Sequence, residues 1–273
     1  MSNLKKRAIS SVLYVALFLL ALYFGEITSL IWFGLLSLIC LWEFYQLFKE
    51  KDIRPIGLSA VVVGVFAFLA MATQHGDSNW WPLLIAFLAL LCVVELFKKQ
   101  QEPLLNLSVT FMGMLYICAP LALLYRLGFY SMEGMTETFN MEVLLGYFFI
   151  LWTNDTAAYF LGSKWGKRKL MPSISPKKSW EGFWGGILFG LQIGYLNSVL
   201  FSVFDSLTWL IISLIVGVFG SLGDLVESSF KRSLNIKDSS QLIPGHGGIL
   251  DRLDGVFISA PMVYVALHYL SSL

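Results

Sequence analysis

The feature that most constrains this chain is a series of long apolar stretches. A helix needs about 20 mostly apolar residues to cross the hydrocarbon of a bilayer, and nine stretches reach or approach that length. Charged residues make up only 14% of the chain, against about 25% in an average soluble domain. We therefore expect an all-α, polytopic integral membrane protein. Its nine expected transmembrane helices cover approximately residues 8–24, 28–48, 56–72, 80–97, 105–125, 141–161, 182–204, 207–226 and 255–270.

Basic residues are unevenly distributed between the ends of these segments. If the N-terminus lies in the cytoplasm, all but one of the 19 Lys and Arg residues fall on the cytoplasmic side, and only Arg126 falls on the other. Cytoplasmic loops of membrane proteins carry this excess of positive charge. The pattern therefore predicts a cytoplasmic N-terminus. It also supports nine spans, because one span more or fewer would destroy the asymmetry.

Near the cytoplasmic ends of the expected spans lie four acidic residues: Glu43, Glu95, Asp155 and Asp224. A charge near the bilayer centre costs about 2.5 to 3.5 kcal/mol on insertion scales, so such residues normally face protein or water and often mark function. Glu43 and Glu95 are close enough to the interface to extend toward water or to pair with neighbouring lysines, and we interpret them in this way. Asp155 lies deeper, so extension toward water or pairing with a lysine explains it less well.

The first long cytoplasmic loop, residues 162–182, is basic and rich in Pro, Ser and Gly. Attraction of its lysines to anionic lipid, worth about 1 kcal/mol each, is one explanation. The stretch Ser-Pro-Lys-Lys-Ser at 175–179 leads into the start of a helix, and lysines and hydroxyls at a helix start can also hold a phosphate. Lys177, Lys178 and Ser179 are therefore candidate phosphate-binding residues.

The second long cytoplasmic loop joins Asp224 to a pair of aspartates, Asp251 and Asp254. The spacing of this pair places both carboxylates on one side of a helix that begins near Leu250. Three carboxylates gathered at one membrane face would repel one another by about 3 kcal/mol per pair, at about 5 Å and an effective dielectric near 20. A cation must therefore offset them.

Two kinds of cation fit this loop. Lys231, Arg232 or Arg252 could form a structural salt-bridge cluster with the aspartates. Alternatively, oxygen ligands on a cytoplasmic face suit Mg²⁺, which commonly binds one or two carboxylates plus substrate phosphates. Glycines on both sides of His246 let the backbone approach a ligand closely, which favours the metal. His246 itself could donate to a phosphate or only hydrogen-bond to the backbone.

Glycine recurs every four residues in the seventh expected span, at Gly182, Gly186, Gly190 and Gly194. Such a stripe lets another helix backbone pack closely, either within the chain or across a homodimer. We interpret it as a packing feature rather than as part of a site.

Residues 228–254, SSFKRSLNIKDSSQLIPGHGGILDRLD, closely resemble the signature of the phosphatidate cytidylyltransferases, also called CDP-diacylglycerol synthases. The pattern is Ser, two residues, Lys-Arg, four residues, Lys-Asp, then Pro-x-His-Gly-Gly, two residues and Asp-Arg-x-Asp. The stretches NDTAAYFLGSKWGKRKL and SPKKSWEG resemble the other recurrent segment of the family, so the resemblance extends from about residue 154 through the last span. Every signature position is filled here, by Ser228, Lys231, Arg232, Lys237, Asp238, Pro244, His246, Gly247, Gly248, Asp251, Arg252 and Asp254.

The resemblance implies a reaction in which CTP and phosphatidic acid give CDP-diacylglycerol and pyrophosphate for phospholipid biosynthesis. It implies Mg²⁺ as cofactor, with a monovalent cation such as K⁺ as a candidate second ion. It also implies a multi-pass protein of the inner (plasma) membrane whose active site faces the cytoplasm, with no nucleic acid partner. We expect residues 1–140 to hold the first five spans and residues 141–273 to form the catalytic region with the last four.

The resemblance and the charges together assign roles to individual residues. The expected metal ligands are Asp224, Asp251 and Asp254, and the expected catalytic residues are these aspartates with Lys178 and Arg252. The expected substrate-binding residues are Lys177, Ser179, Lys231, Arg232, Lys237, His246, Gly247, Gly248 and Asp155.

Two other activities fit part of the pattern. A phosphatidyltransferase that consumes a CDP-lipid would also place aspartates and Mg²⁺ at the interface, but its pattern of Asp-Gly, Ala-Arg and two further aspartates is absent. An ion-coupled transporter would explain buried acids. However, transporters favour midplane sites in broken helices, often with repeat symmetry, and the sequence shows neither.

Overall fold

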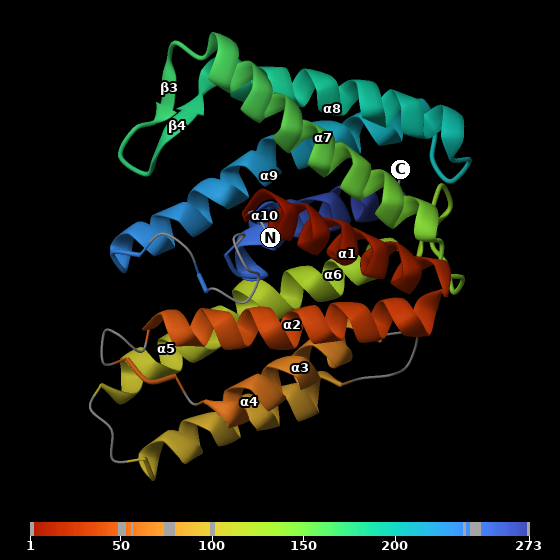
Figure 1. The fold of residues 1–273 in the computed structure, drawn as a ribbon. Helices are drawn as coiled ribbons and strands as arrows, with labels where there is room; N and C mark the ends of the chain where they lie inside the picture. The colour runs from red at the N-terminus through yellow and green to blue at the C-terminus, as the bar shows by residue number, and fades with distance from the viewer. Residues whose placement is uncertain are drawn as a thin grey trace. The chain divides into compact units, whose positions relative to one another are not determined.

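The computed structural model describes residues 3–48, 53–55, 57–73, 80–98, 102–236, 239–240 and 247–271, and most of these residues are helical (Figure 1). Two short antiparallel hairpins join helices: β1 (Tyr130–Ser131) pairs with β2 (Gly134–Met135), and β3 (Lys169–Met171) pairs with β4 (Ser175–Ser179). The helices are α1 (Asn3–Tyr23), α2 (Glu26–Phe48), α3 (Leu58–Ala72), α4 (Trp81–Leu96), α5 (Pro103–Gly113), the π-helical turn η2 (Met114–Cys118), α6 (Ala119–Leu127), α7 (Met141–Trp165), α8 (Trp180–Leu200), α9 (Ser206–Ser233) and α10 (Leu250–Leu270).

Each expected apolar segment coincides with one of these helices over most of its length, with residues 105–125 on the run α5–η2–α6, while residues 201–204 of the seventh segment follow the end of α8. The prediction of an all-α membrane protein is confirmed, whereas the number of nine spans and the orientation stay predictions. α1, α3 and α4 contain shorter apolar stretches, and α7, with 25 residues, carries Asn154 and Asp155 in its interior. Within the described residues, five helical runs are long and apolar enough to cross a membrane: Glu26–Phe48, Pro103–Leu127, Trp180–Leu200, Ser206–Ser233 and Leu250–Leu270.

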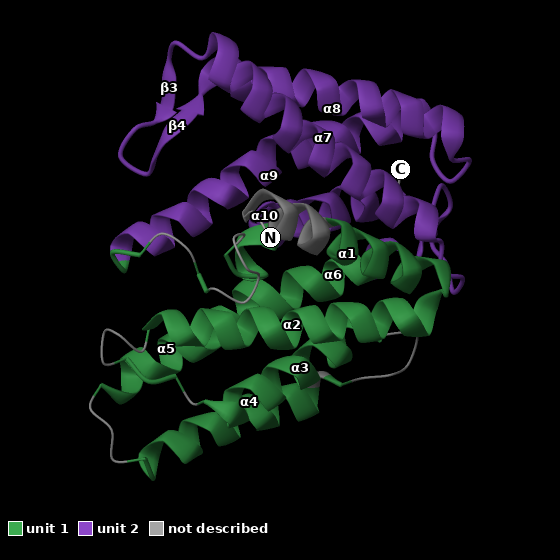
Figure 2. Cartoon of the chain, viewed as in Figure 1, with its two compact units in different colours: residues 1–125, 234–253 green, residues 126–233, 254–273 purple. Residues whose placement is uncertain are grey.

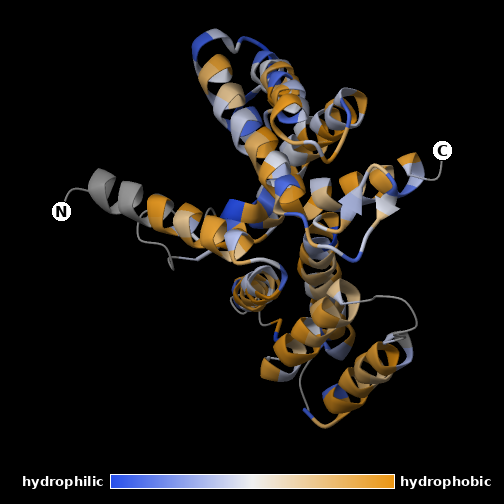
Figure 3. Ribbon diagram, turned by 90° about the vertical axis from the view of Figure 1, so that its right-hand side faces the viewer, coloured by the Kyte–Doolittle hydropathy of each residue, from blue (hydrophilic) through white to orange (hydrophobic). Residues whose placement is uncertain are grey.

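Large apolar side chains are exposed along the helices as well as buried between them, and hydrophobic residues recur along the helices (Figure 3). Leu58, Leu104 and Leu115, for example, are 72%, 78% and 75% exposed. Soluble proteins rarely expose apolar surface on this scale. A helix that is apolar on all sides suits a membrane span, which contacts protein on one side and lipid on the other.

The chain forms two compact units and passes between them at three points, after residues 125, 233 and 253, the last of them inside α10 (Figure 2). Unit 1 comprises residues 1–125 and 234–253. Its core lies around α2, whose Phe33, Leu41 and Phe44 are buried. The Tyr45 hydroxyl of α2 donates to the carbonyl oxygen of Thr110 on α5 at 2.8 Å, which satisfies a polar group that would otherwise be costly to bury.

Unit 2 comprises residues 126–233 and 254–273. Its helix α8 packs mainly against α7 and α9, and the glycine stripe makes the contact with α7 possible. A Cβ on Gly182 would lie 2.6 Å from the carbonyl oxygen of Ala158, and one on Gly186 would lie 2.8 Å from that of Asn154. The stripe therefore packs within the chain and gives no support to a homodimer. The expected division after residue 140 stays a prediction.

The first basic loop folds as the β3–β4 hairpin, which leads directly into α8. Ser179 caps this helix, because its hydroxyl accepts the N–H of Gly182 at 3.2 Å. The Glu181 carboxylate accepts the N–H groups of Lys167 and Arg168, each at 3.1 Å. These contacts hold the start of the hairpin against the first turn of α8.

Candidate active site

Helices α9 and α10 touch through their backbones at the position of two aspartates. A Cβ added to Gly223 on α9 would lie 2.5 Å from the carbonyl oxygen of Asp254 and 3.2 Å from the Cα of Gly255, both on α10. A Cβ on Gly255 would in turn lie 3.3 Å from the carbonyl oxygen of Gly220. Glycines permit this close approach. Because Asp224 directly follows Gly223, it is brought beside Asp254.

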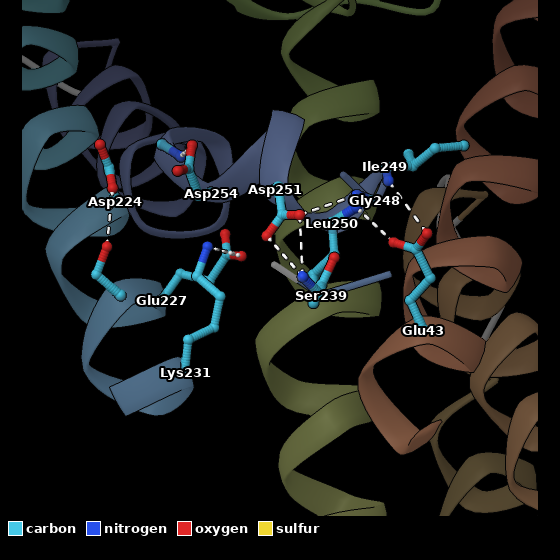
Figure 4. A network of polar contacts seen from close by, with 12 residues as sticks. Glu43, Asp224, Glu227, Lys231, Ser239, Gly248, Ile249, Leu250, Asp251 and Asp254 are labelled. Carbon is cyan, nitrogen blue, oxygen red and sulfur yellow. Dashed lines mark hydrogen bonds and ion pairs between the residues drawn. The ribbon is translucent and has the colours of Figure 1, made fainter. Parts of the chain in front are cut away.

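Four carboxylates interact around this crossing, and we call them the α9–α10 acidic cluster. Asp254 interacts electrostatically with Asp224 and Glu227, both drawn in Figure 4, and with Asp155 of α7. Glu227 is 2% exposed, whereas Asp224 and Asp254 are half-buried and Asp155 is exposed. Like charges this close raise one another's energy. Glu227 was not predicted from the sequence, although its i, i+4 spacing to Lys231 was an available signal.

Two lysines partly offset these charges. Lys178 Nζ lies 2.7 Å from Asp224 Oδ2 and donates to the carbonyl oxygen of Ser221 at 3.1 Å. Lys231 Nζ lies 3.0 Å from Glu227 Oε1, one helical turn away. Two of the four carboxylates, Asp224 and Glu227, thus lie in ion pairs with lysines.

The β3–β4 hairpin positions Lys178. This residue lies on β4 and is half-buried, while its neighbour Lys177 is exposed, since successive residues of a strand point to opposite faces. At the tip of the hairpin, Arg232 Nε donates to the carbonyl oxygen of Ile174 at 3.4 Å. The hairpin is therefore held to the first turn of α8 at its base and to the end of α9 at its tip.

Asn154 connects α7 to the same part of α9. It is fully buried, and its Nδ2 donates to Ser221 Oγ at 3.4 Å and to Asp155 Oδ1 at 3.5 Å. The carbonyl oxygen of Ser221 is also the acceptor for Lys178. Ser221, which was not predicted from the sequence, thus links α7, α9 and β4 beside the acidic cluster.

In unit 1, Asp251 organises the segment that precedes α10 (Figure 4). Its carboxylate accepts the N–H of Ser239 at 3.0 Å and that of Gly248 at 2.9 Å. Gly247 has a φ of +83°, a left-handed conformation that favours glycine. Gly248 is so closely packed that a Cβ would lie 2.5 Å from Glu43 Oε2. The backbone conformation at Gly247 and the close packing at Gly248 therefore each favour glycine, whether or not these residues contact a substrate.

Glu43 and Glu95 are buried, so the prediction that they extend toward water is wrong. Lys49, Lys51 and Lys99, with which they could pair, lie outside the described residues. Glu43 is 1% exposed and accepts the N–H groups of Ile249 at 3.2 Å and Leu250 at 2.8 Å. Glu95 is 3% exposed and accepts from Asn106 Nδ2 at 2.8 Å. Hydrogen bonds offset the cost of burying a carboxylate. For Glu43 these partners lie 206 and 207 residues further along the chain, where its local sequence could not reveal them.

Of the remaining predicted site residues, some lie within the described part of the chain and others lie outside it. Arg252 is exposed in the first turn of α10, while Lys237 and His246 lie outside the described residues. Within the described ranges, no three His, Cys, Asp or Glu side chains form a group that could hold a metal ion. Mg²⁺ commonly needs only one or two carboxylates and takes its other ligands from water and phosphates. The half-buried carboxylates of Asp224 and Asp254 fit that chemistry.

Known proteins resemble this chain over nearly its whole length. Residues 5–270 match the cytidylyltransferase family. The phosphatidate cytidylyltransferase of Haemophilus influenzae is 34% identical in an alignment 286 residues long. The alignment covers 94% of this chain and 96% of that protein. Proteins of the same name from Staphylococcus haemolyticus and Staphylococcus aureus are 32% and 31% identical, each over 97% of this chain and 99% of the relative. The match includes both compact units, and the chain belongs to the cytidylyltransferase family.

Proposed function

We propose that this protein is a phosphatidate cytidylyltransferase, which transfers CMP from CTP to phosphatidic acid and releases pyrophosphate, giving CDP-diacylglycerol for phospholipid biosynthesis. The observation that carries the proposal is the full-length match to proteins of that name. The chemistry of the α9–α10 acidic cluster supports it. Phosphoryl transfer between two polyanions needs charge neutralisation and accurate placement, and the cluster combines carboxylates suited to a divalent metal with lysines suited to phosphate.

The proposal includes an orientation in the membrane. The protein would span the inner membrane nine times, with its N-terminus and its active site on the cytoplasmic side, as the distribution of Lys and Arg predicts. Phosphatidic acid keeps its acyl chains in the bilayer and its phosphate at the interface, while CTP arrives from the cytosol. A site at the cytoplasmic ends of the helices is accessible to both.

We assign Asp224 and Asp254 as ligands of Mg²⁺. Asp251, one turn earlier on α10, remains the third proposed ligand. The gathering of these carboxylates around one helix crossing, where they act electrostatically on one another, supports this assignment. Bound there, Mg²⁺ would neutralise phosphate oxygens and stabilise the leaving pyrophosphate. A monovalent cation such as K⁺ is the candidate for a second ion.

The side chains have mainly to bind and orient the substrates. The phosphate of phosphatidic acid is already an anion near neutral pH, so its attack on the α-phosphorus of CTP needs in-line placement rather than a general base. Lys177 and Lys178 of the hairpin and Lys231 and Arg232 of α9 are the proposed phosphate-binding residues. Arg can clamp a phosphate with two hydrogen bonds, whereas Lys acts as a point charge. Further proposed contacts come from Arg252, Lys237, His246, Gly247, Gly248, Ser179 and Asp155.

Purified protein incubated with radiolabelled CTP, phosphatidic acid and Mg²⁺ tests this function. We expect label to move into the lipid fraction as CDP-diacylglycerol, with one pyrophosphate released per lipid formed. Omitting phosphatidic acid or chelating the metal should abolish the product. A phosphatidyltransferase would instead consume added CDP-diacylglycerol when an alcohol is supplied, and an ion-coupled transporter would form no labelled lipid. Either result would refute the proposal.

A further inference from the structure

Glu43 is a buried acid of α2 whose hydrogen-bond donors lie directly before the α10 aspartates. Its Oε2 accepts the Leu250 N–H at 2.8 Å, and its Oε1 accepts the Ile249 N–H at 3.2 Å and the Ser240 hydroxyl at 2.5 Å. All these residues belong to unit 1. Figure 4 shows the carboxylate facing the start of α10. We call Glu43 with these three donors the Glu43 clamp.

The clamp acts on the first residues of α10. Leu250 begins that helix, and the first N–H groups of a helix have no partner within it. A carboxylate satisfies them and is further favoured by the positive end of the helix dipole. Asp251 is the next residue, and its own carboxylate accepts the N–H of Gly248. Glu43 and Asp251 therefore hold the same short segment through different N–H groups.

Gly248 provides a second, independent indication that this contact is built into the fold. A Cβ there would lie 2.5 Å from Oε2 and 2.9 Å from Cδ of Glu43, so a side chain would push the carboxylate away from the helix. Glu95 offers the contrast. It is an equally buried acid of unit 1, but it accepts from the side chain of Asn106 on α5.

We infer that Glu43 is a positioning residue of the active site: its carboxylate fixes the start of α10 and thereby the direction of the Asp251 side chain. Glu43 itself contacts neither substrate. The inference rests on the proposed function, because Asp251 is expected to take part in that reaction. A misplacement of about 1 Å at the reacting groups can lower a rate about 100-fold, so loosening the clamp should be visible in kcat.

The variant Glu43→Gln tests the inference. Gln keeps the shape of the side chain but replaces one acceptor oxygen with an amino group that faces an N–H donor. We expect kcat for cytidylyl transfer to fall about 100-fold, with the KM values for CTP and phosphatidic acid changed less than about 3-fold. Amide hydrogen exchange should accelerate in residues 247–253 and stay unchanged in residues 206–233. The exchange measurement does not depend on activity.

Glu95→Gln is the matched control, because it makes the same chemical change in an equally buried acid of the same unit. We expect its kcat to stay within about 2-fold of wild type, since distant sites act independently, and exchange in residues 247–253 to stay unchanged. Wild-type kcat in Glu43→Gln would overturn the inference. So would equal losses of kcat with equal exchange patterns in the two variants, because a general loss of stability would produce them.

Two further results separate the inference from the proposed function. If the wild-type protein transfers no cytidylyl group, the proposed function fails, and accelerated exchange in Glu43→Gln still supports the clamp. If Glu43→Gln does not accumulate in the membrane, Ser240→Ala removes one donor from the same carboxylate. A drop in kcat of about 3-fold or more with faster exchange then supports the inference, and wild-type values for both overturn it.

Discussion

The two groups of acids on either side of the unit boundary are held in different ways. In unit 1, Glu43 and Asp251 accept backbone N–H groups. In unit 2, Asp224 and Glu227 pair with lysine side chains. A backbone N–H is fixed in the fold, whereas the ammonium group of a lysine sits on a flexible stem and can move aside for a metal ion or follow a phosphate. The contrast distinguishes acids that shape the fold from acids that can exchange their partners.

The largest effect expected from this contrast is on activity at Asp254. Asp254→Asn should lower cytidylyl transfer about 1000-fold or more. Its thermal unfolding midpoint in detergent should stay the same or rise, because one of four mutually repelling carboxylates is lost. Asp251→Asn should also lose activity, but it should lower the free energy of unfolding by about 1–3 kcal/mol, because its carboxylate accepts two N–H groups.

Labelled-CTP turnover and thermal unfolding of the two variants check this pair of outcomes. Equal stability of Asp251→Asn and Asp254→Asn would break the contrast between fixed and exchangeable acids. Near wild-type turnover in Asp254→Asn would remove this residue from the active site.

A smaller effect is expected at Lys178, the counterion of Asp224. Lys178→Ala should chiefly weaken substrate binding and raise a KM about 10- to 100-fold, the size expected for losing a hydrogen bond to a charged group. Lys169→Ala, an exposed lysine on the opposite strand of the hairpin, serves as control and should leave KM unchanged. Steady-state kinetics with each substrate varied in turn make the comparison. Unchanged KM values for both substrates in Lys178→Ala would contradict the assignment.

The close crossing of α9 and α10 should show as a modest cost in stability. In Gly223→Ala the new methyl group would meet the backbone of Asp254, so the helices must separate, at a cost of about 1–3 kcal/mol in the free energy of unfolding. In Gly190→Ala the nearest atom is Ile150 Cγ2 at 3.6 Å, an ordinary contact. That variant should be neutral or stabilised by up to about 1 kcal/mol. Equal unfolding midpoints for the two variants would argue against the crossing.

The smallest effect concerns Asp205, an exposed acid outside both groups. The Thr208 hydroxyl and N–H hold the pKa of Asp205 below its ordinary value, and the N–H donates to Oδ1 at 2.9 Å. A carboxyl group whose pKa is lower in the folded than in the unfolded protein stabilises the fold at pH values above its unfolded-state pKa. This stabilisation is lost as the pH falls through its folded-state pKa. Asp205→Ala should therefore cost about 0.5–1 kcal/mol near pH 7 and less near pH 3. Thermal unfolding at both pH values checks this, and an equal cost at both would contradict it.

The helices were predictable from the sequence because a bilayer leaves the backbone few alternatives. Apolar runs that cross lipid must satisfy their N–H and C=O groups internally, and each expected segment coincides with a helix over most of its length. The β3–β4 hairpin was not predicted, since its basic residues show no alternation of apolar and polar side chains. It depends on contacts such as those of Glu181 with Lys167 and Arg168.

The candidate site was predictable where its residues are close in sequence or belong to the signature. Asp251 and Asp254 followed from their spacing and their resemblance to the family. The role of Glu43 could not be predicted, because the Ser240 hydroxyl that it binds lies 197 residues away. The pairing of Lys178 with Asp224 was not predicted either, although both residues were singled out, because a sequence does not show which charges meet.

The length of α9 has a consequence for how the two substrates are brought together. Its 28 residues span about 42 Å at a rise of about 1.5 Å per residue, while the hydrocarbon is about 30 Å thick. In the proposed orientation, α9 would extend about 12 Å beyond the hydrocarbon, and Arg232 near its end contacts the tip of the hairpin. A continuous helix rather than a flexible loop would then set the distance from the membrane at which the nucleotide meets the lipid head group.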